Sequence, residues 1–137
     1  MGGTAVSQGL TDNAKRLLRE PVLAHIASID SAGRPNISPV WIDVDGDDVV
    51  FNTAEGRVKA RNLHANPNVA VSVVDPANPY RVIALRGTVT EMTHEGADAH
   101  IDALSHKYVG VDYQNRREGE QRIKVRIRPE RIAMQPE

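Results

Sequence analysis

The stretch FNTAEGRVKARNLHAN (Phe51–Asn66) combines a strand, a glycine turn and a short helix, and the rest of the fold is interpreted around it. A strand-like segment passes through a turn at Gly56 into a short helix-like segment that carries Arg57, Lys59 and Arg61. Unpaired backbone N–H groups at the start of a helix carry partial positive charge, and nearby cations add to it. The stretch therefore fits either a phosphate site or a solvated basic helix face, and its spacing alone does not decide between them.

The residues before this stretch predict one helix followed by a β-meander. Thr11–Arg19 has its apolar residues on one helical face, with Thr11 as a suitable N-cap. Val22–Ile29 is an apolar run of strand length, and Ile37–Val44 and Val49–Thr53 read as two more strands. Asp45–Asp47 supplies a glycine-containing hairpin turn between those two strands.

The residues after it predict three further strands and a second long helix. Val69–Val74 and Tyr80–Met92 are strand-like, and Gly87 inside the latter indicates a β-bulge or a close backbone approach. Glu95–Tyr108 reads as a helix, with Ala99, Ile101, Ala103, Leu104 and Tyr108 as its apolar members. Arg122–Arg128 alternates apolar residues with cations, as in a half-buried strand whose charged side faces water. We predict a mainly β fold: a six-stranded antiparallel split β-barrel with flanking helices.

Length and charge narrow the class of protein. The 137 residues fit a single domain over residues 11–137, preceded by a disordered segment at residues 1–10. The formal net charge of −1 argues against a nucleic-acid binder, which is normally basic. No apolar run approaches the ~20 residues that cross a bilayer, and no signal peptide is evident. The absence of cysteine is consistent with the cytoplasm, which we take as the expected location.

Two clusters of possible metal ligands do not have the spacing of a metal site. Asp43–Asp48 lacks the glycine and glutamate positions of a calcium loop and fits a hairpin turn better. His94, His100 and His106 are six residues apart, so successive members rotate by roughly 240° around a helix and do not converge. We therefore predict no metal site. No catalytic acid, base or nucleophile motif is evident either, so any chemistry would belong to a bound cofactor.

Several short motifs occur together in a characteristic order. They are G-R-P at Gly33–Pro35, S-P-V-W at Ser38–Trp41, F-N-T at Phe51–Thr53, K-A-R-N-L with N-P at Lys59–Pro67, and R-G at Arg86–Gly87. In this order the chain resembles the split β-barrel proteins of the pyridoxamine-phosphate-oxidase-like superfamily, over roughly residues 11–133. It looks most like the actinobacterial branch that uses the deazaflavin coenzyme F420. The resemblance implies homodimers with cofactor sites at the subunit interface. The C-terminal Arg- and Trp-rich segment of true pyridoxamine-phosphate oxidases is not seen, so vitamin B6 oxidation is not expected.

The resemblance also implies which residues hold the cofactor. Arg57, Lys59 and Asn62 would grip its phosphate, with Arg61 as a further candidate. The residues implied around the ring and the ribityl chain are Ser38, Pro39, Val40, Trp41, Thr53 and Ala54. The first four lie on one strand, whose backbone N–H groups could hydrogen-bond the polar ring edge.

Three assignments stay open on the sequence. Trp41 either contacts the ring or packs in the core. Tyr80 and Arg81 either flank the ring or the acidic tail of the deazaflavin, or contact neither. Arg116, Arg117 and Arg122 either clamp that tail or form a solvated face.

The functional expectation is an oxidoreductase in which reduced F420 gives hydride to a small electron-poor organic molecule. Two alternatives remain: an FMN-binding flavoprotein on the same fold, and a non-catalytic carrier of F420. No residue of the chain is expected to be catalytic itself, and no nucleic-acid or membrane partner is expected.

Overall fold

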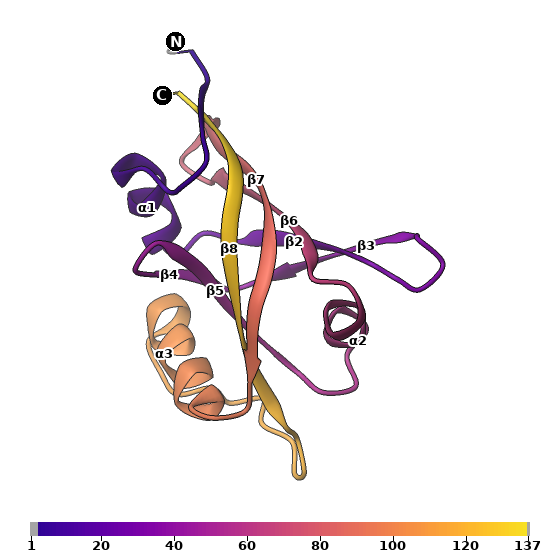
Figure 1. Cartoon of the computed structure of the whole chain (residues 1–137). Helices are drawn as coiled ribbons and strands as arrows, with labels where there is room; N and C mark the ends of the chain where they lie inside the picture. The colour runs from indigo at the N-terminus through magenta and orange to yellow at the C-terminus, as the bar shows by residue number, and fades with distance from the viewer. Residues whose placement is uncertain (1–2, 137) are drawn as a thin grey trace.

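A computed structural model describes residues 3–136 of the chain, which form three helices and eight strands (Figure 1). The helices are α1 (Asp12–Arg19), α2 (Val58–Ala65) and α3 (Ala97–Val109). The strands are β1 (Ala5–Ser7), β2 (Ala24–Ile29), β3 (Pro35–Val40), β4 (Ile42–Asp45), β5 (Asp48–Ala54), β6 (Asn68–Asp75), β7 (Asn78–Thr93) and β8 (Arg122–Gln135).

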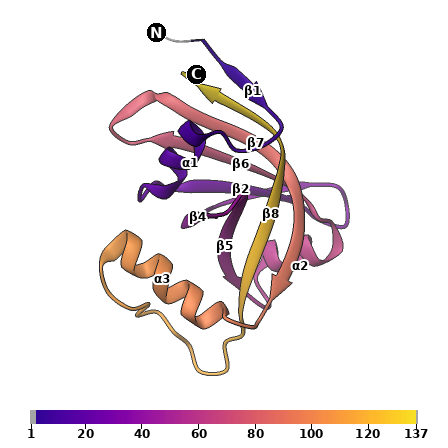
Figure 2. The same cartoon turned by 60° about the vertical axis from the view of Figure 1, so that its left-hand side comes forward.

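One antiparallel sheet builds the molecule, with the strand order β3-β2-β6-β7-β8-β5-β4 and β1 added beside β8. The long strands β7 and β8 run side by side through the centre, and the sheet curls around them (Figures 1 and 2). Because β3 and β4 end the order without pairing to each other, the barrel is split between them. The predicted split barrel with flanking helices is confirmed, although the structure has eight strands where the sequence predicts six.

One additional strand arises because the predicted strand Ile37–Val44 is interrupted at Trp41. β3 pairs with β2, whereas β4 pairs with β5. Two α3 side chains bind the backbone of Ile42: its N–H donates to the Tyr108 hydroxyl at 3.0 Å, and its carbonyl accepts from Lys107 Nζ at 2.6 Å. These contacts satisfy backbone groups that a neighbouring strand would otherwise pair, so the chain can change partners at Trp41.

The other additional strand lies in the segment predicted to be disordered. Ala5–Ser7 forms β1 and pairs with the end of β8, with Val6 opposite Ala133. β8 continues to Gln135, well beyond the predicted end at Arg128, and so offers an edge on which this segment can pair. Residues 1–2 lie outside the described part of the chain.

Most of the predicted apolar faces form the core. Thr11 caps α1 by accepting a hydrogen bond from the Ala14 N–H at 3.1 Å. The apolar residues of α1 and β8 that are buried as predicted are Ala14, Leu17, Leu18, Ile123, Val125 and Ile127. In α3, Ile101 and Leu104 are buried, but Ala99 and Ala103 are exposed, contrary to the prediction. The helix contacts the sheet through a narrow stripe, because its other side borders water.

The predicted irregularity at Gly87 is confirmed. The register between β7 and β8 shifts between Arg86 and Gly87. A Cβ atom at Gly87 would collide with the carbonyl oxygen of Arg128, so only glycine allows the two backbones to approach this closely. The predicted hairpin turn is also present, with Gly46 at a φ of 63° between the paired Asp45 and Asp48.

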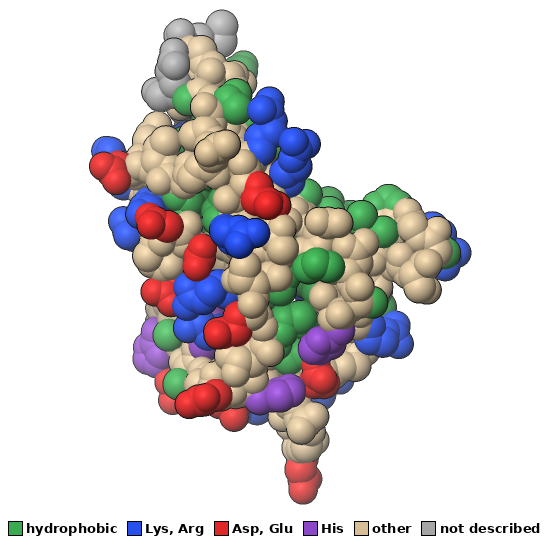
Figure 3. Space-filling view, viewed as in Figure 1, with side chains coloured by type: hydrophobic (Ala, Val, Ile, Leu, Met, Phe, Trp, Pro, Cys, Tyr) green, Lys and Arg blue, Asp and Glu red, His purple; other side chains and the backbone are tan. Residues whose placement is uncertain are grey.

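The surface carries acidic and basic side chains in similar proportion, as expected from 17 Lys and Arg against 18 Asp and Glu in the sequence. On the face shown in Figure 3, basic and acidic side chains lie interspersed and form no large patch of one sign. No helix among residues 3–136 is long and apolar enough to span a membrane. Within the same residues, no group of three or more His, Cys, Asp or Glu side chains could hold a metal ion.

Candidate functional site

A pocket of about 290 Å³ opens where the break between β3 and β4 meets β5, the start of α2 and the inner face of α3. One part of its wall is apolar and aromatic, and the other carries cations and amides. Its lining residues are Leu23, Pro39, Val40, Trp41, Asn52, Thr53, Arg57, Lys59, Ile101, Leu104, Tyr113, Asn115 and Arg122. Such a combination suits a molecule with a flat apolar ring and an anionic group.

The start of α2 forms the polar wall. Gly56 has a φ of +86° and turns the chain from β5 into the helix. Arg57 is the N-cap, and no side chain caps the first turn. In α1, by contrast, the hydroxyl of Thr11 satisfies one first-turn N–H group. No described side chain accepts a hydrogen bond from the first N–H groups of α2, so these groups are free to donate to a bound anion.

Three cations from two elements converge on this wall: Arg57, Lys59 and Arg122. Burial lowers the pKa of the Lys59 ammonium, and the charges of Arg57 and Arg122 lower it further. Glu120 lies 4.0 Å from Arg57 and 3.0 Å from Arg122, whereas no described residue forms an ion pair or hydrogen bond with Lys59. The site therefore has more positive than negative charge, which an anionic ligand would balance.

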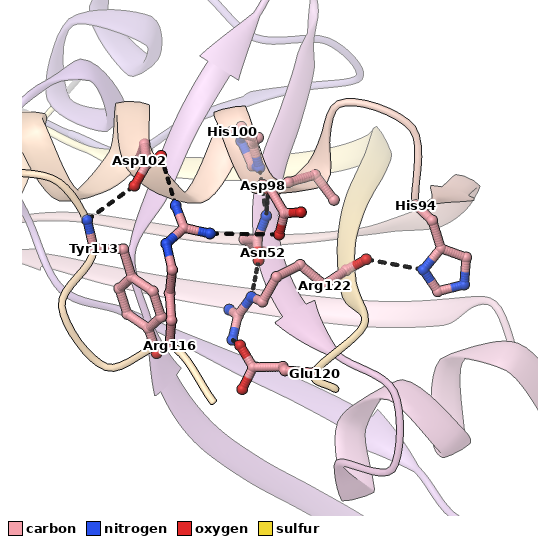
Figure 4. Close-up of polar contacts among 10 residues, drawn as sticks. Asn52, His94, Asp98, His100, Asp102, Tyr113, Arg116, Glu120 and Arg122 are labelled. Carbon is pink, nitrogen blue, oxygen red and sulfur yellow. Dashed lines mark hydrogen bonds and ion pairs between the residues drawn. The ribbon is translucent and has the colours of Figure 1, made fainter. Parts of the chain in front are cut away.

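Arg122 is buried, contrary to the prediction that the charged side of β8 faces water. Its Nε donates to Asn52 Oδ1 at 2.8 Å, and its Nη1 donates to Glu120 at 3.0 Å (Figure 4). The guanidinium lies 5.1 Å from the centre of the Tyr113 ring. Arg122 differs from the later cations of β8 because it begins the strand beneath the 110–121 connector, where Glu120 and Tyr113 cover it.

Asn52 links Arg122 to α3. Its Nδ2 donates to the Ala97 carbonyl at 2.9 Å and lies 3.0 Å from His100 Nδ1. Burial lowers the pKa of His100 to about 4, so the ring is neutral at pH 7. A neutral ring with Nδ1 as acceptor carries its proton on Nε2, which is buried without a partner among the described residues. His100, Asn52 and Arg122 form one hydrogen-bonded chain that ends at the pocket.

Aromatic residues form the opposite wall. Trp41 stacks on Tyr108, with ring centres 5.3 Å apart, and meets the edge of Tyr113 at 6.3 Å. Burial raises the pKa of Tyr108 to about 12, so its hydroxyl stays protonated and donates to the Val22 carbonyl while it accepts from the Ile42 N–H. Trp41 thus packs against other aromatic rings and also lines the pocket.

Six of the predicted cofactor residues line the pocket: Pro39, Val40, Trp41, Thr53, Arg57 and Lys59. The Thr53 hydroxyl is buried and has no hydrogen-bond partner among the described residues. The Ser38 hydroxyl is likewise unpartnered, although Ser38 does not line the pocket. A buried hydroxyl that lacks a partner, on a residue that lines the pocket, fits a site that holds a polar ligand.

Four predicted residues lie elsewhere. Ala54 is buried in β5, and Arg61 is exposed on α2. Asn62 is buried and donates to the Ser28 hydroxyl at 3.1 Å, so its amide joins α2 to β2. Tyr80 is 66% exposed near the start of β7. None of these four side chains lines the pocket, although Ala54, Arg61 and Asn62 lie near lining residues in the sequence.

The arginines of the connector have different surroundings. Arg116 forms ion pairs with Asp102 at 2.5 Å and Asp98 at 3.6 Å on α3. Arg117 is exposed and, with Arg116, lines a second hollow next to Arg57. Arg116 is therefore balanced by carboxylates of its own chain.

The sequence did not predict Asn52, Tyr113, Asn115, Ile101 and Leu104 as residues of the site. Asn52 is a polar residue inside an otherwise apolar strand, a signal that could have drawn attention to it. Tyr113 and Asn115 lie in the irregular connector, whose path the sequence does not predict. Ile101 and Leu104 were predicted to be apolar residues of the helix, without a role at a site.

Comparison with known proteins supplies a family. The family model described as pyridoxamine 5'-phosphate oxidase matches residues 10–135. A solved structure named F420 reductase is 31% identical, with a TM-score of 0.81, over 90% of this chain and 98% of that one. No curated protein matches significantly.

Two more distant structures share the fold. A conserved hypothetical protein, Rv2991 from Mycobacterium tuberculosis, is 18% identical over 93% of this chain and 86% of its own, with a TM-score of 0.73. HutZ, a heme storage protein from Vibrio cholerae, is also 18% identical, over 85% of this chain and 87% of its own, with a TM-score of 0.62. At these identities the likeness concerns the fold alone.

Proposed function

The chain belongs to the pyridoxamine 5'-phosphate oxidase family, and from this premise we propose that it is an F420-dependent oxidoreductase. The family and the similar F420 reductase support a flavin or deazaflavin cofactor. The observation that carries the proposal is the pocket, in which a cation-rich wall and an aromatic wall face one cavity. Such a cavity fits a ring system that bears a phosphate.

Different residues of the pocket would bind different parts of the cofactor. Arg57 and Lys59, with the first N–H groups of α2, would hold the phosphate. The Thr53 hydroxyl, which has no hydrogen-bond partner among residues 3–136, would donate to the same group or to the ribityl chain. Pro39 and Trp41 would cover one face of the ring. The bound cofactor would supply hydride transfer to a small electron-poor organic molecule, and the protein would orient the two partners and exclude water.

A carrier of F420 is the second candidate, favoured by one observation. None of the residues that line the pocket is Asp, Glu, His or Cys. A carrier needs tight binding and no proton donor, so this lining would suffice for it. A reductase would take its proton from solvent or from the Tyr113 hydroxyl.

We also propose a homodimer. An open apolar face includes Leu23, which directly precedes β2, Ile37 on β3 and Val74 on β6, which are 50%, 66% and 47% exposed. Leu23 and Pro39 belong to this face and also line the pocket, so a second copy seated on it would extend the cofactor site. Ile37→Asp should convert the dimer to a monomer by light scattering, while Val6→Asp on β1 should not. A wild-type monomer that binds cofactor fully would contradict this.

Cofactor titration tests the main proposal. Purified protein is titrated with F420 and with FMN, and binding is followed by fluorescence. Tighter binding of F420, followed by oxidation of reduced F420 with activated alkenes or quinones, supports the reductase. Tighter binding of FMN would replace F420 in the proposal. Tight binding of F420 without turnover of any acceptor would favour the carrier.

A further inference from the structure

We propose that Arg122 recognises the phosphate of the bound ligand as a third cation, and that Asn52 positions it for this role. The proposal rests on the proposed function for the identity of the ligand but on Arg122's own contacts for its role. Arg122 lies on β8, far in sequence from Arg57 and Lys59 on α2. No phosphate-site pattern in the sequence includes it.

The first argument is the donor count of a buried guanidinium. An arginine side chain has five N–H donors in a planar fork. The side chain of Arg122 is only 6% exposed, yet Asn52 and Glu120 take just two donors, one from Nε and one from Nη1. No described residue accepts from Nη2. Because Arg122 also lines the pocket, its remaining donors are available to a ligand there.

The second argument is that the fork is held in place before any ligand binds. Asn52 fixes one edge, Glu120 fixes another, and the Tyr113 ring packs 5.1 Å from the guanidinium carbon (Figure 4). A fixed planar fork suits two parallel hydrogen bonds to phosphate oxygens. Little side-chain entropy would be lost on binding, since the arginine is already ordered.

The third argument is local charge. Arg57, Lys59 and Arg122 contribute three positive charges, against one carboxylate at Glu120. Arg122 lies close enough to Lys59 to lower its pKa, which ties β8 and α2 to one electrostatic site. These groups complement a phosphate better than they complement a neutral ring.

Asn52 acts through Arg122. Its Oδ1 accepts from Arg122 Nε, while its Nδ2 is bound by the Ala97 carbonyl and by His100. These two contacts set which way the amide faces, so the oxygen points at the arginine. Asn52 is therefore a positioning residue that transmits the placement of α3 to the pocket.

FMN and riboflavin, which differ only in the phosphate, are the deciding pair for Arg122. F420 is titrated beside its deazaflavin core, which lacks both the phosphate and the acidic tail. Arg122→Gln should weaken the phosphate-bearing ligand roughly ten- to hundredfold and leave the other within about twofold. Arg126→Gln on the same strand is the matched control and should change neither. Equal losses for both ligands, or no loss, would overturn the proposal.

Folding defects are separated from loss of the contact. Arg122→Lys keeps the charge but not the fork, and it should recover only part of the affinity for the phosphate-bearing ligand. If Arg122→Gln does not fold, Arg122→Lys carries the comparison, with the same outcomes deciding. Full affinity in Arg122→Lys would show that no fork is used and would overturn the bidentate contact.

Failure of the proposed function is distinguishable. If no flavin or deazaflavin binds, inorganic phosphate is used as the probe and the melting temperature as the readout. A rise in the wild type that is lost in Arg122→Gln and kept in Arg126→Gln supports the site. Equal rises, or no rise in the wild type, overturn it.

A double-mutant cycle tests Asn52. Asn52→Ala should weaken the phosphate-bearing ligand but not its phosphate-free pair. The same change in the Arg122→Gln background should have no further effect on binding, because the residue that Asn52 positions is gone. Additive losses would mean that Asn52 does not act through Arg122.

Discussion

Arg122 and Arg126 lie four residues apart on β8 and point to the same side of the sheet, yet their surroundings differ. Arg126 binds two carboxylates of the β4–β5 hairpin, Asp45 at 2.5 Å and Asp48 at 3.1 Å. Arg122 has an amide and one carboxylate, which also lies near Arg57. At the Arg126 end of the strand the positive charge is balanced by carboxylates, whereas at the Arg122 end positive charge is in excess.

This difference shows where a ligand would contribute most. At Arg126 the hairpin already supplies the counter-charge, and the pKa of Asp45 is lowered chiefly by its hydrogen bond to that arginine. At Arg122 a buried cation and the half-buried Lys59 line a cavity with one carboxylate nearby, and charge that is out of water and not fully paired is costly. An anion that binds in that cavity would pair with the cations and so lower the electrostatic free energy of the site. Four predictions test this contrast.

The largest effect is expected from Lys59→Ala. Lys59 has no ion pair or hydrogen bond with the described residues. Its removal should therefore make the free energy of cofactor binding less favourable and leave the contacts within the fold unchanged. We expect cofactor binding to weaken by about 1.5–3 kcal/mol, the range for a hydrogen bond to a charged group. Fluorescence titration measures it, with Arg16→Ala on the exposed side of α1 as the control. An unchanged dissociation constant would remove Lys59 from the phosphate site.

The next effect concerns pH. The pKa of His100 falls from 6.5 in the unfolded chain to about 4 in the fold, mainly because of burial. The unfolded chain therefore binds more protons between these values, so stability from His100 is complete above pH 6.5 and declines as pH falls toward 4. The loss should be on the order of 1–2 kcal/mol, since the ring is partly screened by solvent.

Urea unfolding of wild type and His100→Gln over this pH range isolates the contribution. The variant should show a flatter stability profile, because it lacks the titrating ring. Parallel profiles would mean that other groups cause the pH dependence.

A smaller effect is expected from Arg126→Ala. The variant loses two ion pairs, but the Asp45 side chain is 52% exposed and solvent screens the pairs. The free energy of unfolding should fall by about 0.5–1 kcal/mol, and cofactor affinity should not change. Urea denaturation and titration measure the two quantities. A large loss of cofactor affinity would show that the two ends of β8 are not independent.

The smallest effect is expected from Arg61→Ala. Arg61 belongs to the basic stretch but is exposed and lines neither hollow. Cofactor affinity should change by less than about twofold, as long-range attraction between exposed charges is screened by salt. A tenfold loss would return Arg61 to the phosphate site and would mean that α2 turns further toward the pocket when ligand binds.

Much of the fold could be predicted because its signals are local. The apolar face of α1 and the alternation of Ile123, Val125 and Ile127 reflect the helical and strand periods directly. Gly87 also signalled its role, since only glycine permits that backbone approach. The break at Trp41 was missed, because its cause is the pair Lys107 and Tyr108, more than sixty residues away.

The site was predicted only in part for the same reason. Arg57 and Lys59 follow a glycine turn at a helix start, a pattern that allows an anion site but, taken alone, fits a solvated basic face equally well. Asn62 and Arg61 share the same motif but face β2 and solvent, because a helix turns its residues in different directions. Arg122 joins the pocket only through the pairing of β5 with β8.

The sequence by itself determined the three helices, six of the strand segments, the hairpin turn at Gly46 and the positive charge at the start of α2, because these depend on neighbours along the chain. Tertiary structure alone decided which cations have counter-charges. The pairing of β4 with β5 brings Asp45 and Asp48 to Arg126, while the 110–121 connector brings only Glu120 to Arg122. Charge balance depends on distances across the sheet, and a linear order of residues does not contain them.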